Sequence, residues 1–234
     1  MRVVLIGRGR LATSLLAALQ QAGHEVASIN SRTLEGLPME ADVFIVSVKD
    51  SALKDVISHA TKGREQQLFV HTAGSMPMSL FDGYTSRRGV FYPMQTFSKE
   101  RLVDFAEVPV FVEGESPQIW QLAESVSHRV CELSSDDRKY LHLAAVFACN
   151  FANHCYALSA ELLEKHGIPF DVMLPLIDET ARKVHELHPL DAQTGPAVRY
   201  DENVIRMQSD LLSDAPALQE IYNLLSLNIH RKAK

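Results

Sequence analysis

A run of four apolar residues, 3–6, directly before a glycine-bearing turn constrains the fold of this chain most strongly. Such a run is typical of a strand that is buried on both faces of a parallel sheet. Leucines then follow at helical spacing between residues 11 and 19, and Gly23 stands where a helix C-cap glycine belongs. A strand-like pattern resumes over residues 25–29. The first thirty residues therefore predict a βαβ unit.

The same alternation continues over the first half of the chain and then stops. Further apolar runs predict buried strands that each lead into a polar segment. These runs cover residues 43–48, 68–70, 90–92, 108–112 and 130–133. A helix-start signal follows at residues 134–137, and no strand-like run comes after it. We therefore expect an α/β fold, with a Rossmann-like parallel sheet over residues 1–133 and an all-helical domain over residues 134–234, whose first long helix runs from Asp136 to about His166.

Composition excludes several classes of function. The 234 residues carry a net charge of −6, which gives no basic field for nucleic acid, and no apolar run is long enough to span a bilayer. The chain starts directly in a strand without a signal-peptide pattern, and its three cysteines favour reduced thiols. His185 and His188, with Glu186 between them, lie at a helix end with no third metal ligand in sight, so we expect no metal. We expect a cytoplasmic protein that binds neither nucleic acid nor membranes.

The glycine motif after the first strand has the form G-x-G-x-x-A. Gly7 is expected to make the tight turn, and Gly9 to let a pyrophosphate approach the backbone. The amides of Arg10, Leu11 and Ala12 would then face this ligand at a helix N-terminus. The alternative is a turn that binds nothing, because the motif alone is weak evidence. The strand before it, the helix after it and the further strand–helix units favour a dinucleotide.

The end of the second strand indicates which dinucleotide binds. An NAD site places an acidic residue about twenty positions after the motif, and this chain has none there. Ser31, Arg32 and Thr33 instead offer two hydroxyls and a guanidinium, which suit the extra phosphate of NADP. Ser47 and Val48, after the third strand, complete the expected cofactor contacts. The alternative for Arg32 is a solvated turn residue.

Six segments carry a resemblance to a known family over nearly the whole chain. They are Gly7–Ala12, His71–Ser75, Tyr92–Lys99, His142–Asn153, Pro175–Ile177 and Gln193–Asp201. The sequence resembles NADP oxidoreductases that join a Rossmann-like domain to a C-terminal helical domain of unknown function of the 2520 type, relatives of 6-phosphogluconate dehydrogenase, ketopantoate reductase and pyrroline-5-carboxylate reductase. The resemblance implies NADP as cofactor and a homodimer formed through the helical domain.

The chain departs from this family at three positions. Family members often carry His, Tyr and His where this chain has Tyr92, Leu141 and Gln208. These departures argue against roles that need the family's titratable groups at those positions.

The candidate catalytic residues are His142 and Asn150, two turns apart on one face of the long helix. Related dehydrogenases use a lysine and an asparagine on the corresponding helix, but Val146 occupies the place of that lysine. His142 is therefore the expected proton donor, since an intrinsic pKa of about 6.5 suits a general acid near neutrality. Asn150 is expected to contact the substrate or the nicotinamide amide. The alternatives are a buried histidine bonded to a carbonyl and, for Asn150, a hydrogen bond between helices.

The expected substrate site lies beyond the carboxyl ends of the strands, in a cleft facing the helical domain. Arg199 could hold a substrate carboxylate in its own subunit or across a dimer, or form an ion pair with Asp201 or Glu202. The other expected substrate contacts are Thr72, Gly74, Ser75, Gln95 and Asn153. The sequence thus predicts an NADP-dependent oxidoreductase acting on a small carbonyl or imine metabolite. A non-catalytic NADP-binding sensor and an NAD-using dehydrogenase are the alternatives.

Overall fold

The computed structural model describes residues 1–98, 101 and 103–233. Lys99, the last residue of the Tyr92–Lys99 segment, lies outside the described residues. The chain divides into two compact units, Met1–Asn150 and Phe151–Lys234. The last strand ends at Glu132, close to the boundary expected from the sequence, whereas the first unit continues into the helix that follows this strand.

The first unit contains a seven-stranded sheet in the order β2-β1-β3-β4-β5-β6-β7. Its strands are β1 (Arg2–Ile6), β2 (Glu25–Ile29), β3 (Val43–Val46), β4 (Phe69–His71), β5 (Arg88–Pro93), β6 (Val110–Glu113) and β7 (Val130–Glu132). Strands β1 to β5 are parallel, which confirms the Rossmann-like α/β fold. Strand β6 runs antiparallel to β5, and β7 runs parallel to β6. The described part of the β5–β6 connection contains one 3-10 turn, Phe105–Glu107, rather than the helix that usually makes a parallel crossover.

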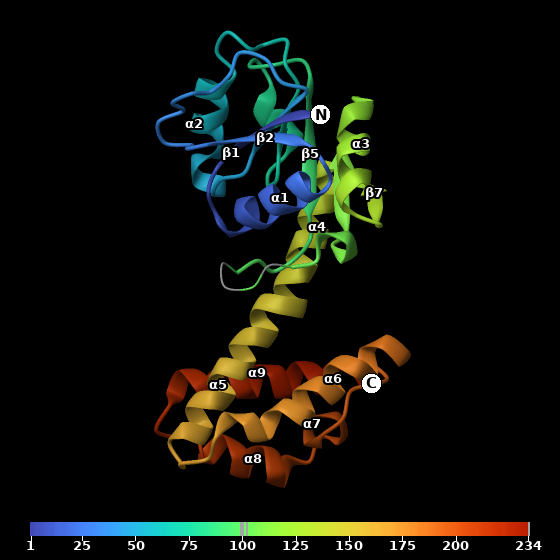
Figure 1. Cartoon of the computed structure of the whole chain (residues 1–234). Helices are drawn as coiled ribbons and strands as arrows, with labels where there is room; N and C mark the ends of the chain where they lie inside the picture. The colour runs from blue at the N-terminus through green and yellow to red at the C-terminus, as the bar shows by residue number, and fades with distance from the viewer. Residues whose placement is uncertain (99–100, 102, 234) are drawn as a thin grey trace. The chain divides into compact units, whose positions relative to one another are not determined.

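Helices cover both faces of this sheet. Alternate residues of each strand point to opposite sides and therefore contribute to two separate cores. Val3 and Leu5 of β1 belong to one core, together with apolar residues of α1 (Arg10–Gln21) and α3 (Pro117–Val126). Val4 and Ile6 belong to a second core, with α2 (Asp50–Ala60) and the 3-10 turn Met78–Phe81. The three helices appear around the sheet in Figure 1. The central strands are therefore buried on both sides, as their apolar runs predict.

A long helical stretch follows β7, in agreement with the helix expected from Asp136 to His166. It consists of α4 (Ser135–Ala145), a π-helical segment (Val146–Phe151) and α5 (Ala152–Glu164). Ser134 caps its N-terminus by accepting a hydrogen bond from the amide of Asp137 at 3.1 Å. The boundary between the two units falls within the π-helical segment, and π-helical turns occur frequently at functional sites.

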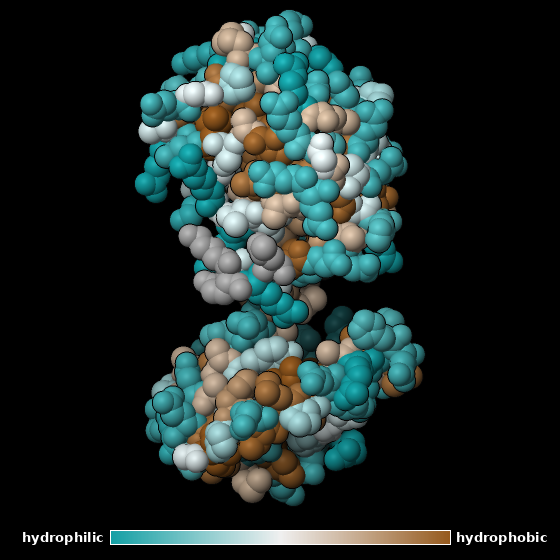
Figure 2. All heavy atoms as spheres, viewed as in Figure 1, coloured by the Kyte–Doolittle hydropathy of each residue, from teal (hydrophilic) through white to brown (hydrophobic). Residues whose placement is uncertain are grey.

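The described residues of the second unit form helices without strands. After α5 come the 3-10 turn Phe170–Met173, α6 (Leu174–Glu186), α7 (Pro196–Arg199), α8 (Glu202–Asp210) and α9 (Pro216–Lys232). This unit has few buried side chains, and many of its large apolar residues are exposed. Figure 2 shows such apolar side chains on the surface of the helical unit. None of the described helices combines the length and the apolar character needed to cross a membrane.

Candidate functional site

The predicted site residues of the first unit gather at one edge of the sheet. Strands β1 to β5 are parallel, so their carboxyl ends lie at the same edge. The segments that follow these ends are 7–9, 30–33, 47–49, 72–77 and 94–96. Together they contain most of the expected cofactor contacts and four of the expected substrate contacts.

Gly7 and Gly9 occupy different environments in the turn between β1 and α1. Gly7 has φ +137°, and a Cβ at this position would overlap the carbonyl oxygen of Ser47. The close approach of the loops after β1 and β3 therefore requires glycine at position 7. Gly9 has φ −77°, and a Cβ there would meet no atom within 4 Å. The fold itself therefore does not require glycine at position 9. A ligand that approaches the backbone there would explain why the residue is glycine.

The N-terminus of α1 presents unpaired backbone donors beside Gly9. The first hydrogen bond of the helix runs from the amide of Thr13 to the carbonyl of Gly9 at 2.9 Å. The amides of Arg10, Leu11 and Ala12 therefore have no acceptor within the helix. The first turn contains no acidic residue, and no side chain caps it. This end of the helix suits an anionic group such as a diphosphate.

The loop after β2 places Ser31, Arg32 and Thr33 next to the glycine turn, because β2 is the neighbour of β1. The amide of Arg32 donates to Oδ1 of Asn30 at 3.0 Å, which fixes the loop backbone. The Arg32 side chain is exposed and forms no ion pair within the described part of the chain. Its guanidinium is thus available to an anion at this edge.

Hydrogen bonds join the loops after β3 and β4. The Thr72 hydroxyl donates to the Ser47 hydroxyl at 3.1 Å, and both side chains are buried. The Ser75 hydroxyl donates to Asp50, the first residue of α2. These bonds hold four predicted residues, Ser47, Val48, Thr72 and Ser75, in one ordered part of the edge.

His142, Tyr92 and Gly74 meet where α4 packs against the sheet. The Tyr92 hydroxyl lies 3.1 Å from Nδ1 of His142, and the two rings meet edge to face with centroids 6.1 Å apart. A Cβ at Gly74 would lie 2.5 Å from Nδ1 of His142 and 2.9 Å from Cε2 of Tyr92. Glycine at position 74 is therefore needed for this contact. His142 is half-buried and bonded to a hydroxyl, unlike the alternative of a buried histidine bonded to a carbonyl.

A buried ion pair fixes the first turn of α4, one turn before His142. The Arg138 side chain is 1% exposed and pairs with Glu113 at the end of β6. It also donates to the carbonyl of Met76 at 2.7 Å, in the loop that contains Gly74. The Ser135 hydroxyl donates to the same Glu113 carboxylate at 2.7 Å. These contacts tie α4 both to the sheet and to the loop after β4.

His71 at the end of β4 is a buried structural histidine. The amide of Ala73 donates to its Nδ1 at 3.2 Å, and Nε2 lies 3.3 Å from the carbonyl of Pro77. Burial, together with the charge of Arg138, lowers the pKa of His71 to about 4. The imidazole is therefore neutral at pH 7, with the proton on Nε2, and it shapes the loop over residues 72–77.

The remaining predicted residues are less constrained. Gln95 is exposed after β5, and its Oε1 accepts from the amide of Thr96 at 2.8 Å. Asn150 is exposed in the π-helical segment, and Asn153 is exposed on α5 in the second unit. Arg199 is exposed on α7 and forms no ion pair with any residue that the structure describes, while Asp201 caps α8 instead. The roles of these four residues stay predictions.

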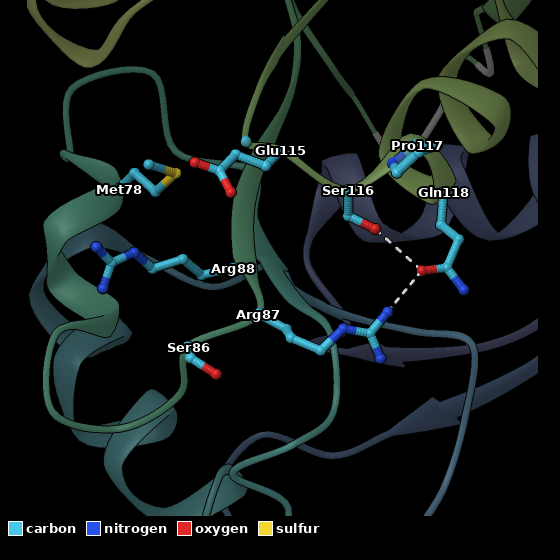
Figure 3. A pocket seen from close by; sticks show the side chains of 9 residues that line it. Met78, Ser86, Arg87, Arg88, Glu115, Ser116, Pro117 and Gln118 are labelled. Atoms are coloured by element: carbon cyan, nitrogen blue, oxygen red, sulfur yellow. Dashed lines mark hydrogen bonds between the residues drawn. The ribbon is translucent and has the colours of Figure 1, made fainter.

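A cavity of about 540 Å³ lies elsewhere in the first unit (Figure 3). It opens between Arg88, the first residue of β5, and the N-terminus of α3. Its guanidinium groups are engaged, because Arg87 donates to Gln118 at 2.8 Å and Arg88 pairs with Asp82. The cavity thus lies at the beginning of β5, at the opposite end of this strand from the predicted site.

Sequence reasoning missed one residue of this site and one contact. The segment from Tyr92 to Thr96 is expected at this edge because it follows a predicted strand, but the contact of the Tyr92 hydroxyl with His142 is not predicted. The position of Tyr92 at the end of an apolar run was a usable signal. Arg138 was overlooked, although it precedes His142 by one helical turn and so lies on the same helix face.

The comparisons with known proteins agree with this architecture. The family model described as "Domain of unknown function (DUF2520)" matches residues 108–229. A search of curated proteins finds no match. A solved structure from Bacteroides fragilis, named a "putative NADP oxidoreductase", is 50% identical and covers 98% of each chain, with a TM-score of 0.91.

Two more distant structures share the fold. A protein from Thermotoga maritima is 20% identical over 99% of each chain, with a TM-score of 0.81. An imine reductase from Myxococcus stipitatus, solved with NADP+, is 15% identical over 99% of this chain and 93% of that chain, with a TM-score of 0.68. The extent of the family match and the identity to the Bacteroides protein lead to one conclusion: the chain belongs to the DUF2520 family.

Proposed function

We propose that this protein is an NADP-dependent oxidoreductase that reduces the carbonyl or imine group of a small metabolite. The observation that carries the proposal is the open space beside Gly9, in a strand–turn–helix where the fold itself does not require glycine. The 50% identical Bacteroides protein, named a "putative NADP oxidoreductase", supports the same activity.

The chain offers groups for both phosphate-bearing parts of NADP. The amides of Arg10, Leu11 and Ala12 would bind the diphosphate, and Arg32, flanked by the hydroxyls of Ser31 and Thr33, would bind the additional phosphate. Ser47 and Val48 lie one strand further along the same edge. When bound, the reduced cofactor supplies a hydride.

His142 would supply the proton that a carbonyl or imine reduction needs. It lies on α4 against Gly74, in the loop that also carries Thr72 and Ser75. A protonated imidazole can donate a proton to the oxygen or nitrogen of the reduced group. Thr72, Gly74, Ser75, Gln95 and Asn150 are proposed to bind the substrate.

We extend the proposal to the assembly and the location of the protein. A homodimer formed through the helical unit would cover the exposed apolar side chains of that unit, and Asn153 and Arg199 would act on the substrate from this unit. A cytoplasmic location is supported by three cysteines that are free thiols.

Calorimetric titration with NADPH and NADH tests the cofactor assignment. We expect NADPH to bind roughly 10- to 100-fold more tightly than NADH. This ratio corresponds to one or two contacts between the guanidinium and the phosphate, each contributing on the order of 1 kcal/mol. Arg32→Ala should remove this preference and leave NADH binding unchanged. Arg129→Ala is the matched control, because Arg129 is an exposed arginine directly before the outermost strand β7. Equal affinities for both nucleotides in the wild type would contradict the NADP assignment and favour an NAD-using enzyme.

Turnover tests the catalytic assignment. A panel of keto acids, aldehydes and cyclic imines should reveal NADPH consumption that His142→Gln lowers by 10²-fold or more, the usual contribution of a general acid. Tight NADPH binding without turnover on this panel would favour the non-catalytic sensor.

A further inference from the structure

Tyr92 is the only hydroxyl-bearing side chain that forms a hydrogen bond with His142 among the residues that the structure describes. The distance of 3.1 Å between the Tyr92 hydroxyl and Nδ1 joins β5 to α4, two elements fifty residues apart in the chain. Nε2 of His142 has no hydrogen-bond partner within the described residues. The two ring nitrogens therefore have different environments.

The Tyr92 hydroxyl remains protonated at the near-neutral pH at which a dehydrogenase works. Burial raises the pKa of Tyr92, and the nearby Arg138 charge opposes this effect only in part. The phenol oxygen can accept the Nδ1–H of the protonated ring and, after the ring has lost its Nε2 proton, the Nδ1–H of the neutral ring. It can thus hold the same edge of the ring in both states.

Gly74 makes this orientation possible. The Gly74 backbone lies against Nδ1 and Cγ of His142 and against the Tyr92 ring, with no space for a Cβ. The Nδ1 edge of His142 is thus enclosed by the loop after β4 and by the end of β5. This packing disfavours rotation of the imidazole by half a turn.

We propose that Tyr92 is a positioning residue that holds the Nδ1 edge of His142 inside the first unit, so that Nε2 is the nitrogen that gives a proton to the substrate. This inference rests on the proposed function. In the step, the Nε2–H bond of the protonated ring breaks and its electron pair stays on Nε2. The proton bonds to the substrate oxygen or nitrogen, which gains an electron pair as its carbon is reduced at the expense of NADPH. Nδ1–H stays bonded to the Tyr92 oxygen.

The charged groups around the pair have ion-pair or hydrogen-bond partners of their own. Arg138 on α4 binds Glu113 of β6, and His71 at the end of β4 is neutral at pH 7. On the loop side, Ser75 is bonded to Asp50 of α2. Among the described residues, Tyr92 is therefore the one group that forms a hydrogen bond with the imidazole.

Nitrogen NMR of the full chain labelled with ¹⁵N-histidine tests this assignment without a substrate. His142→Gln identifies the His142 signals. In the wild type at alkaline pH, we expect Nδ1 to carry the proton and to show the shift of a hydrogen-bonded donor, with Nε2 unprotonated. Tyr92→Phe should abolish this shift and leave a mixture of the two N–H forms.

Gly74→Ala provides an independent variant that keeps both functional groups and displaces the ring. It should reproduce the effect of Tyr92→Phe. Tyr84→Phe is the matched control, because the Tyr84 hydroxyl has no hydrogen-bond partner among the described residues. The buried His71 reports folding, since its Nδ1 signal must stay unchanged in every variant.

An unchanged Nδ1 signal of His142 in Tyr92→Phe or in Gly74→Ala, with His71 intact, overturns the proposal. This result is independent of NADPH calorimetry. Loss of the hydrogen-bond shift together with absent NADPH binding would refute the proposed function and leave the Tyr92–His142 pair established.

Discussion

Two glycines of one short motif are glycine for different physical reasons. Gly7 has a backbone conformation that side chains rarely adopt and lies against the Ser47 carbonyl, so the fold requires it. Gly9 has an ordinary backbone conformation and open space where a side chain would project. The first residue serves folding, and the second serves a ligand if NADP binds as proposed. Substitution can separate these roles.

We predict that alanine at position 7 mainly reduces stability and that alanine at position 9 mainly reduces NADPH binding. Gly7→Ala should lower the free energy of unfolding by about 3 kcal/mol or more, because strain and overlap with Ser47 add together. Gly9→Ala should cost under about 1 kcal/mol, the difference between glycine and alanine at a helix N-cap, while it weakens NADPH binding. Urea denaturation and calorimetry measure the two quantities. Unchanged NADPH affinity in Gly9→Ala would contradict the proposed diphosphate site.

At the scale of elements, the sequence predicted what depends on local pattern. Strands β1, β3, β4 and β5 follow from their apolar runs, and the loops at their ends follow from the parallel topology. The contacts that organise these loops could not be predicted in this way. Tyr92 and His142 are fifty residues apart, and Arg138 and Glu113 are twenty-five apart. Such pairs depend on how α4 packs against the sheet, which no local pattern specifies.

The direction of β6 also could not be predicted from the sequence pattern. An apolar run predicts a strand but not whether that strand runs parallel or antiparallel to its neighbour. The β5–β6 connection decides this, and its described part lacks the usual crossover helix. The reversal has a consequence for the site, because it places Glu113 beside Val90, where Arg138 can reach it.

The loop after β4 gives the first unit a pH-dependent stability. Burial lowers the pKa of His71 from 6.5 to about 4, so the folded state holds the neutral ring. Between these values the unfolded chain binds a proton that the folded chain does not. The free energy of unfolding therefore falls as the pH is lowered through 6.5, and this loss is complete below about 4.

We predict that His71 contributes on the order of 3 kcal/mol to this loss, from the difference between the two pKa values. Urea denaturation at several pH values between 7 and 4 measures it. His71→Gln should flatten the dependence, whereas His59→Gln, an exposed histidine on α2, should keep it. An equal slope in wild type and His71→Gln would show that the ring is protonated inside the fold.

At the scale of the whole molecule, the two units differ in how much they bury. The first unit has two apolar cores with many side chains fully removed from water. In the second unit, Ala197, Leu212 and Ser226 are the only residues classed as buried within the described part. A helical unit of this size with so little buried surface lacks the hydrophobic contribution that normally stabilises a domain. A second copy of the chain would supply it.

We predict that the protein is a dimer whose stability depends on its concentration. Light scattering should give twice the 26.1 kDa of one chain, and the melting temperature should rise with protein concentration. Leu176 and Leu224 are 62% and 61% exposed on α6 and α9, so Leu176→Glu or Leu224→Glu should weaken the dimer if either lies in the interface. Met39→Glu, at an apolar residue 57% exposed in the first unit, is the control and should leave the mass unchanged. A wild-type monomer with a concentration-independent melting temperature would refute the dimer and leave the exposed apolar surface of the helical unit to another partner.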